Sequence, residues 1–263
     1  MNQIVRQFEH IQTQLAQKES HASLFHEQSK TRPNVLFAPP VNFDPALLPD
    51  FSRRAFKEYR LAPRISLPEA QPLPVSLDKL IRQRRTIRRF TNVAVTLEET
   101  AGQLALSYRV TKPGSPHRPV PSGGALYPLE IYLSSLNIEG LDQGLFHYHP
   151  VYHALECLSP EPPLSTLQHI FLPDTLPPGA AYVICICGVL PRNQFKYGEL
   201  GYRLMLLEAG HLAQNILLVA QAQSLAGQPV CGFYDDRMHD YLEVDGVDEV
   251  CLYLLVIGRP YST

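Results

Sequence analysis

Residues 84–90 hold four arginines and one threonine, a group of side chains that could bind phosphate. A guanidinium group forms paired hydrogen bonds with phosphate oxygens, and a hydroxyl adds another donor. A charge run of this kind can equally be a solvated turn, so the pattern alone leaves both interpretations open. The candidate phosphate ligands are Arg84, Arg85, Thr86 and Arg88.

Lys196 and Tyr197 are adjacent and could act together as a proton-transfer pair. Burial lowers the pKa of a lysine toward neutrality, where it becomes an effective general base. The alternative is a surface lysine beside a packed tyrosine. Glu208, Gln214 and Asn215 are polar residues within an apolar helical stretch. Buried polar groups need partners, which could be a cofactor or a neighbouring helix.

His147, His149 and His153 invite a metal-site interpretation. Their spacing spans two short expected strands and the turn at Pro150, and no cysteine or carboxylate set completes a tetrahedral site. We therefore expect no metal. The sequence also contains no GxSxG, HExxH or Rossmann fingerprint.

The stretch Pro121–Tyr132 is a glycine-containing loop that runs into a strand. Gly123 and Gly124 allow a positive φ or a close approach of the backbone to a ligand. The alternation that begins at Leu129 is typical of a half-buried strand. Since a phosphate loop runs from a strand into a helix, we instead expect this loop to be the floor of a planar cofactor site.

These residues need a scaffold, and the hydrophobic pattern predicts one α+β domain over residues 76–263. A first helix is expected after Ser76, which is a suitable N-cap. Its buried stripe should consist of Leu77, Leu80 and Ile81. A capping box formed by Thr96 and Glu99 begins a second helix, which should end near Tyr108.

The longest apolar helical stretch, 200–226, predicts a central helix that is buried on several sides, with Gly227 as its C′ residue. A short helix is expected at 236–242. The expected strands are 129–136, 145–148, 154–158, 181–189 and 250–257. Cys185 and Cys187 should be buried structural thiols in one of them.

The first 75 residues differ in composition from the rest of the chain. Residues 1–28 show helical spacing of apolar residues, and the 42 residues of Pro33–Pro74 contain nine prolines. Proline excludes long helices and central strands, so we expect an N-terminal helix followed by an extended arm over the surface of its own or a partner's domain. One short helix is expected within the arm, near Ala55–Tyr59.

Charge, hydropathy and cysteine usage exclude several classes of function. The net charge of −2 provides no field that would attract nucleic acid or an anionic membrane. The N-terminus is too polar for a secretory signal, and the longest apolar run, Ala180–Leu190, is too short to span a bilayer. Five cysteines without CxxC spacing argue against a disulfide framework or a zinc knuckle. We expect a cytoplasmic protein.

These segments, in this order, resemble the nitroreductase-like flavoproteins, and more narrowly the SagB-type (McbC-like) azoline dehydrogenases. The resemblance covers about residues 76–260. The matching segments are Arg84–Phe90, Arg118–Tyr132, Gly144–Tyr148, Phe195–Tyr197, Glu208–Asn215, Cys231–Phe233 and Ile257–Arg259.

The resemblance implies a nitroreductase-like fold with an antiparallel-dominated central sheet, and a homodimer that binds FMN at the subunit interface. The residues that would hold the phosphate and ribityl chain are Arg84, Arg85, Thr86, Arg88 and Arg259. Those that would lie against the isoalloxazine are Pro121, Ser122, Gly123, Gly124 and Ala125, with Gly232 and Phe233 near its reactive edge. Gln214 and Asn215 would reach the flavin or the dimer interface, and the catalytic pair would be Lys196 and Tyr197.

The implied activity is the oxidation of thiazoline or oxazoline rings to thiazoles or oxazoles in a ribosomally made, modified precursor peptide, beside a partner cyclodehydratase. A base removes the acidic Cα proton of the ring while the flavin takes the hydride. Two alternatives are a general NAD(P)H-dependent nitroreductase or flavin reductase, and a non-catalytic scaffold subunit of a peptide-modifying synthetase. The arginines argue against the scaffold, which has no need of a phosphate site.

Overall fold

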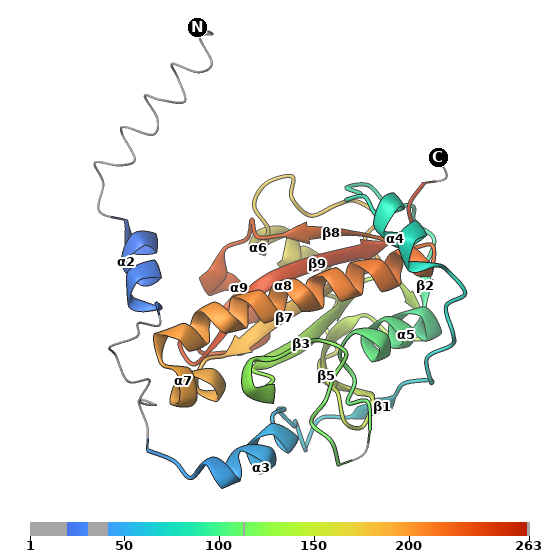
Figure 1. Ribbon diagram of the computed structural model, residues 1–263. Helices are drawn as coiled ribbons and strands as arrows, with labels where there is room; N and C mark the ends of the chain where they lie inside the picture. The colour runs from blue at the N-terminus through green and yellow to red at the C-terminus, as the bar shows by residue number, and fades with distance from the viewer. Residues whose placement is uncertain (1–19, 31–41, 113, 262–263) are drawn as a thin grey trace, which may run out of the picture.

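A seven-stranded sheet lies at the centre of the computed structural model, which describes residues 20–30, 42–112 and 114–261 (Figure 1). In spatial order its strands are β1 (Arg64–Ser66), β6 (Ala154–Ser159), β5 (Gly144–His149), β3 (Leu129–Ser135), β7 (Tyr182–Val189), β9 (Glu249–Gly258) and β8 (Ala226–Val230). All neighbouring strands of this sheet are antiparallel. A separate parallel pair joins β2 (Val95–Thr96) to β4 (Ile138–Glu139). The predicted α+β class with a mainly antiparallel sheet is confirmed.

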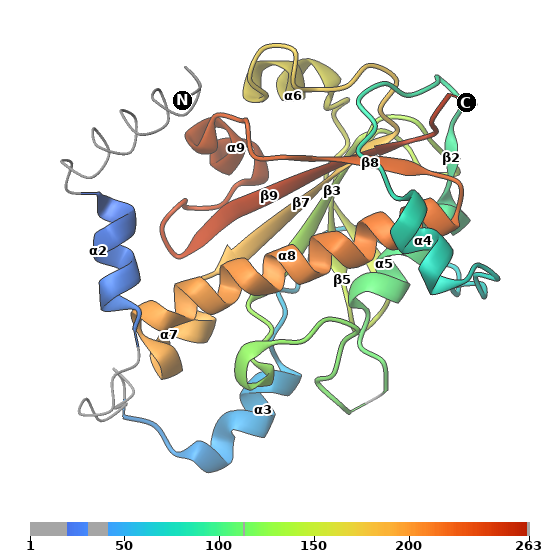
Figure 2. The same ribbon diagram turned by 45° about the horizontal axis from the view of Figure 1, so that its top comes forward.

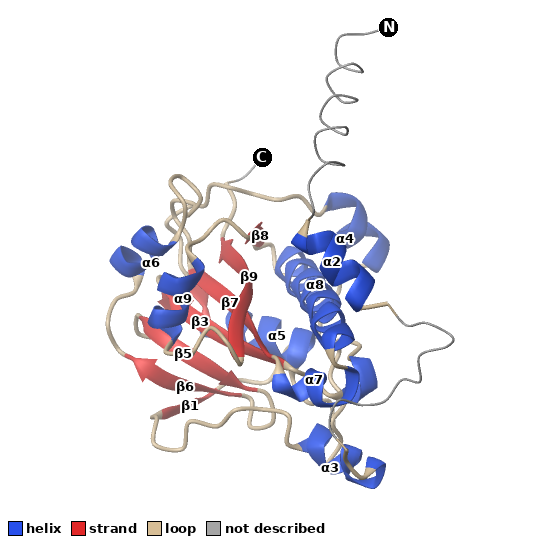
Figure 3. Cartoon of the chain, turned by 90° about the vertical axis from the view of Figure 1, so that its left-hand side faces the viewer, coloured by secondary structure: helices blue, strands red, loops and turns tan. Residues whose placement is uncertain are grey.

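Helices cover both faces of the sheet (Figure 3). One face carries α8 (Glu199–Ala222), α5 (Leu97–Tyr108), α4 (Leu77–Gln83), α7 (Pro191–Tyr197) and α2 (His21–Gln28). The other face carries α6 (Leu164–Ile170) and α9 (Asp235–Leu242). Figure 2 shows α8 running across the strands, with α7 at its N-terminal end and α4 beside its C-terminal end. In the described part of the chain, none of the helices combines the length and apolar character that crossing a membrane requires.

The central strands and α5 form where the hydrophobic pattern and the caps predict them. Cys185 and Cys187 are fully buried in β7, as expected for structural thiols. The capping box of α5 is complete: the Glu99 amide donates to Thr96 Oγ1 at 3.2 Å, and the Thr96 amide donates to Glu99 Oε2 at 2.8 Å. Two donors that a helix N-terminus leaves unpaired are thereby satisfied.

The central helix ends four residues earlier than predicted. Ser224 adopts the left-handed conformation (φ +59°), and the Leu225 amide donates to the Ala220 carbonyl at 2.8 Å. This six-to-one hydrogen bond is the Schellman arrangement, so Ser224 is the C′ residue. Gly227 was expected in that role but instead pairs with Ile257 as part of β8.

The predicted buried stripe of α4 is wrong for this chain, because the side chains of Leu77 and Ile81 are 64% and 60% exposed. Periodicity identified an apolar face but not what covers it.

The predicted short helix near Ala55–Tyr59 is also misplaced. Over residues 42–74 of the arm, the helical residues are η1 (Pro45–Leu47) and α3 (Leu48–Arg53). The amides of Lys57 and Tyr59 donate to carboxylate side chains of the sheet and are therefore not available to a helix. The predicted helix over residues 1–28 falls largely outside the described residues, and α2 is its described part.

Candidate functional site

The glycine loop, residues 121–127, is held in an unusual backbone conformation between α5 and β3. Gly124, Ala125 and Tyr127 have φ values of +64°, +55° and +44°. A left-handed conformation costs a non-glycine residue about 1–3 kcal/mol, and such costs concentrate at functional sites. The Tyr127 amide stabilises the turn by donating to Ser122 Oγ at 2.9 Å. Pro121 and Gly124 are exposed, so the loop presents bare backbone outward.

Lys196 and Tyr197 lie directly beside this loop. They occupy the last turn of α7, which begins at Pro191 and ends before Gly198 (φ +55°). A Cβ atom built on Gly124 would lie 2.6 Å from Tyr197 Oη and 2.9 Å from Lys196 Nζ. The ammonium lies 5.0 Å from the centre of the Tyr197 ring. Two segments far apart in sequence thus converge, and the positive φ value of residue 124 favours glycine there.

A cavity of about 510 Å³ is lined in part by α7, the helix that carries this pair. Its lining is mainly apolar and comes from three places: the arm, the end of the glycine loop, and α7. The lining residues include Leu47, Phe51, Leu126, Arg192 and Phe195. The Phe195 ring packs against Phe51 at 5.5 Å and against Phe43 at 5.0 Å.

The arginine group lies at the opposite end of α8. Arg85 and Arg259 line a cavity of about 890 Å³ beside the helix C-terminus, and Gln221 is part of its wall. The backbone of Thr86 forms an isolated parallel β-bridge with Gly227. Arg84 is half-buried, and Arg88 is exposed. Arg259 Nη2 donates to both oxygens of Glu99, at 3.1 and 2.8 Å.

The two groups are therefore far apart within one chain. Leu204, in the second turn of α8, contacts Gly123, whereas Gln221 stands at the arginine cavity. The seventeen helical steps between them correspond to about 25 Å.

Of the remaining predicted residues, Asn215 lies next to the glycine loop, whereas Gly232 and Phe233 line neither of the two cavities. Asn215 Nδ2 donates to the Pro119 carbonyl at 3.4 Å, next to the glycine loop, and Gln214 is exposed. Gly232 and Phe233 follow β8, where the Leu172 amide donates to the Gly232 carbonyl at 3.1 Å and Phe233 is buried. β8 lies three strands from β3, a separation of roughly 14 Å.

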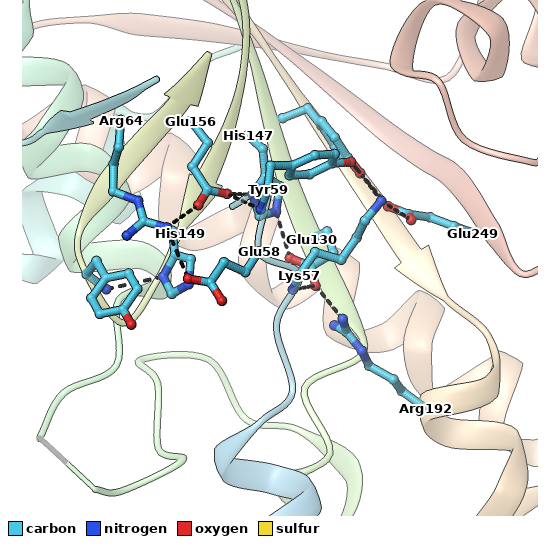
Figure 4. A network of polar contacts seen from close by, with 12 residues as sticks. Lys57, Glu58, Tyr59, Arg64, Glu130, His147, His149, Glu156, Arg192 and Glu249 are labelled. Atoms are coloured by element: carbon cyan, nitrogen blue, oxygen red, sulfur yellow. Dashed lines mark hydrogen bonds and ion pairs between the residues drawn. The ribbon is translucent and has the colours of Figure 1, made fainter. Parts of the chain in front are cut away.

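A buried ionic network, not foreseen from the sequence, fixes α7 and the arm to the sheet (Figure 4). His147 lies between Glu130 and Glu156, and each of its ring nitrogens is 3.0 Å from a carboxylate oxygen. Arg192 of α7 pairs with Glu130 at 2.6 Å, and Arg64 of β1 pairs with Glu156 at 2.7 Å. We call these five residues the His147 network. Its Arg192–Glu130 contact anchors the helix that carries Lys196 and Tyr197.

The charges of the His147 network are set by partners rather than by burial. Burial acts to raise the pKa of Glu130, but the Arg192 charge and the His147 hydrogen bond outweigh it and lower the pKa to about 2. Burial acts to lower the pKa of His147, but hydrogen bonds to the two carboxylates raise it. His147 is therefore a protonated imidazolium between two anions.

The arm closes the same network from outside. The Lys57 amide donates to Glu130 at 2.7 Å, and the Tyr59 amide donates to Glu156 at 3.2 Å. Lys57 Nζ donates to Glu249 at 2.7 Å.

The three histidines have separate partners. His153 lies 3.0 Å from Tyr148 Oη and from the Pro68 carbonyl, whereas His149 Nδ1 accepts from the Tyr152 amide at 3.2 Å. A sequence signal for the network exists, because Glu130, His147 and Glu156 each stand within a predicted strand. The register that brings them together does not follow from the sequence.

Comparisons with known proteins agree with the fold. Residues 81–259, more than half of the chain, match the Nitroreductase family. A protein named as a nitroreductase in Methanocaldococcus jannaschii is 31% identical over 74% of this chain and 96% of its own length. The microcin B17-processing protein McbC of Escherichia coli is 34% identical over 51% of this chain and 51% of its own length.

Three solved structures share the fold. One from Anabaena variabilis, described as a nitroreductase, has a TM-score of 0.71 and 23% identity, covering 90% of this chain and 46% of its own. The E. coli microcin synthetase McbBCD complex with truncated pro-MccB17 has a TM-score of 0.61 and 24% sequence identity, and the match covers 92% of each chain. A protein from Exiguobacterium sibiricum, described as a nitroreductase in complex with FMN, has a TM-score of 0.54 and 16% sequence identity. The match covers 74% of this chain and 92% of that one. The chain belongs to the nitroreductase family, and its relatives include the McbC type of peptide-processing protein.

Proposed function

We propose that the protein is an FMN-dependent dehydrogenase that oxidises thiazoline or oxazoline rings in a ribosomally made, modified peptide. The observation that carries this proposal is the convergence of Gly124 with Lys196 and Tyr197. A flat ring lying on the exposed backbone of the loop would meet both the ammonium and the phenol. The relationship to McbC, which is named for microcin processing, supports a peptide substrate.

The two ends of α8 supply different parts of an FMN site. The glycine loop offers backbone to the isoalloxazine, since Gly124 has no side chain of its own, and the ends of the Tyr197 and Lys196 side chains lie beside that position. The arginine cavity offers guanidinium groups that suit a phosphate. Arg259 Nε is buried and has no partner among the described residues, so one donor at this end is unused. The donor set therefore fits the cofactor.

The separation of these ends favours a homodimer. About 25 Å of α8 lies between them, which is longer than one FMN can bridge within a single chain. We propose that each FMN lies between the glycine loop of one subunit and the arginine cavity of its partner. Exposed apolar side chains of α4 and α8 would become buried between the subunits: Leu77, Ile81, Leu206 and Leu207.

The chain's own residues would orient the substrate and handle the proton. Bound FMN would supply the oxidant, taking two electrons and one hydrogen from the ring. The Cα proton of an azoline is acidic because it lies between an imine and a carbonyl group, and Lys196 or Tyr197 would accept it. The Arg192–Glu130 pair would keep α7 in position. The 510 Å³ cavity beside the pair would take the peptide that flanks the ring.

The test uses the purified protein with FMN and an azoline-containing peptide made by a cyclodehydratase. We expect Lys196→Ala and Tyr197→Phe to retain FMN but to lose about 100-fold or more in the rate of two-hydrogen loss measured by mass spectrometry. Lys112→Ala, a change at an exposed lysine, is the matched control. If either active-site variant keeps FMN and oxidises azolines at the normal rate, the assigned role is wrong.

A general NAD(P)H-dependent reductase is the second candidate. The match to a protein named as a nitroreductase over 96% of that protein's length favours it. Rapid bleaching of the bound flavin by NADH or NADPH, with turnover of nitroarenes and none of azoline peptides, would support this function instead.

A further inference from the structure

Glu208 is a buried acid of α8 that the proposed reaction does not use. Its side chain is 2% exposed, yet neither carboxylate oxygen has a hydrogen-bond partner within the described residues. A buried polar group without partners costs stability and is rare in folded proteins. The position of Glu208 is thus costly for the fold, which suggests a role at the neighbouring loop.

Glu208 lies under the glycine loop. Leu204, one turn earlier on α8, reaches to 3.1 Å from the Cβ position of Gly123. The Ser122 hydroxyl is close enough to lower the pKa of the Glu208 carboxyl, but the two groups do not meet the geometric criteria of a hydrogen bond. Ser122 Oγ already accepts the Tyr127 amide at 2.9 Å. The hydroxyl therefore has one proton left to donate and one further lone pair to offer.

The charge state of Glu208 decides where that proton goes. An ionised carboxylate can only accept, so it draws the Ser122 proton inward. A protonated carboxyl can donate to the remaining lone pair of Ser122, which leaves the Ser122 proton free to point outward across the loop.

The groups that face Glu208 come from three elements. They are Ser122 of the loop, Arg118 of the preceding segment and Tyr108 of α5. Burial raises the pKa of Glu208, whereas Ser122 and the Arg118 charge act to lower it. Burial is the largest of these contributions. The Arg118 guanidinium lies 4.3 Å from the Tyr108 ring centre, and its Nη2 donates to the Ala55 carbonyl. The resulting pKa is about 7, so the change of state falls near neutral pH.

We infer that Glu208 is a positioning residue whose protonation turns the Ser122 hydroxyl toward a planar heterocycle with hydrogen-bond acceptors bound on the glycine loop. The inference rests on the proposed function, in which that heterocycle is the flavin. A protonated Glu208 strengthens flavin binding by one hydrogen bond, and ionisation removes it.

The test is titration of the flavin-free protein with FMN, followed by fluorescence, at about pH 5.5 and about pH 8.5, on either side of the expected transition. One hydrogen bond of about 1 kcal/mol corresponds to about a fivefold change in Kd. The wild type should bind about fivefold more tightly at the lower pH. Glu208→Gln, a permanent donor, should bind tightly at both pH values, and Ser122→Ala should bind weakly at both.

Two controls test whether the pH dependence of flavin binding comes from Glu208 or from another group. The second phosphate pKa of FMN is about 6, so the titration is repeated with riboflavin, which lacks the phosphate. The wild type should keep its pH dependence with riboflavin. Glu199→Gln, at an exposed glutamate of the same helix, should behave as the wild type.

The outcomes distinguish the two proposals. If FMN binds but Glu208→Gln or Ser122→Ala keeps the pH dependence of the wild type, the positioning role is wrong and the flavin site stands. If the wild type binds neither FMN nor riboflavin at any pH, the proposed function fails and the positioning role fails with it.

Discussion

Two glutamates that are almost equally buried, Glu130 in β3 and Glu208 in α8, have pKa values that are shifted in opposite directions. Their exposed fractions are 1% and 2%. Glu130 contacts His147, Arg192 and the Lys57 amide, and its pKa falls to about 2. Glu208 has no hydrogen-bond partner within the described ranges, and its pKa rises to about 7. Partners, and not the depth of burial, therefore decide the charge of a carboxyl group in this protein.

The difference separates a structural region from a functional one. The His147 network pairs each of its charged groups with an opposite charge and joins segments that are distant in sequence: the arm, the sheet and α7. The region beneath the glycine loop combines an unpartnered acid with three left-handed residues. Natural proteins tolerate such costs mainly where function requires them. We therefore expect stability to respond in opposite directions when the two carboxyl groups are neutralised.

The largest effect should follow from Glu130→Gln. The amide would leave Arg192 without its anion in a buried site, and the protonated His147 would keep only Glu156. Breaking a buried ion pair costs about 3–5 kcal/mol, so the free energy of unfolding in urea should fall by about that amount at neutral pH. The control is Glu139→Gln at an exposed position of β4, which should change stability by less than about 0.5 kcal/mol.

The loss caused by Glu130→Gln should also depend on pH. The folded pKa of Glu130 is depressed from 4.5 to about 2, so its stabilisation is complete above about pH 4.5 and is lost as the pH falls toward about 2. The difference between the wild type and the variant should shrink over that range. A difference that stays constant down to about pH 2 would contradict the ionic role of Glu130.

A smaller effect of opposite sign is expected for Glu208→Gln. Because the folded pKa of Glu208 is raised from 4.5 to about 7, the wild type is penalised increasingly as the pH rises through this window. The full penalty is about 3 kcal/mol at most. In urea unfolding of the flavin-free proteins, the variant should match the wild type near about pH 4.5 and exceed it by about 1–3 kcal/mol at about pH 8. Destabilisation at about pH 8 would show that Glu208 has a partner in solution.

The sequence predicted the parts of the fold that depend on local pattern. The strand at β7 follows from its apolar run, and α5 follows from the capping box. The α8 C-terminus was misplaced because Ser224 takes the left-handed position for which glycine is the usual choice. The exposed face of α4 was misjudged because an apolar stripe does not reveal what covers it.

The candidate site was predictable only in part. Each of its segments stood out by composition, and Gly124 converges with Lys196 and Tyr197. The role of the loop as a cofactor floor stays a prediction. The His147 network could not be predicted, since it depends on strand register and on arm contacts across 73 and 97 positions. Long-range pairing of this kind leaves no local signal in a single sequence.

The smallest expected change in the free energy of unfolding comes from replacing either of two arginines of the arm. Arg60 and Arg64 both contact Glu58, at 3.1 and 3.2 Å, but only Arg64 also reaches the buried Glu156. The Arg60 side chain is 83% exposed, whereas that of Arg64 is 34% exposed. Solvent screens part of the Arg64 attraction, so Arg64→Ala should lower the free energy of unfolding by about 1 kcal/mol. Arg60→Ala should leave it unchanged.

The same two variants test whether the His147 network holds the arm to the sheet. Chymotrypsin does not cleave at arginine, so neither substitution removes a cleavage site. Chymotrypsin should cleave the Arg64→Ala variant within the arm faster than the wild type, at aromatic residues such as Phe56 and Tyr59. It should cleave Arg60→Ala no faster than the wild type. If chymotrypsin cleaves both variants faster than the wild type and to the same extent, the contacts with Glu58 at the surface hold the arm instead. Faster cleavage of Arg64→Ala alone would place the attachment at the buried carboxylate of Glu156, whose ion pairs set it apart from Glu208.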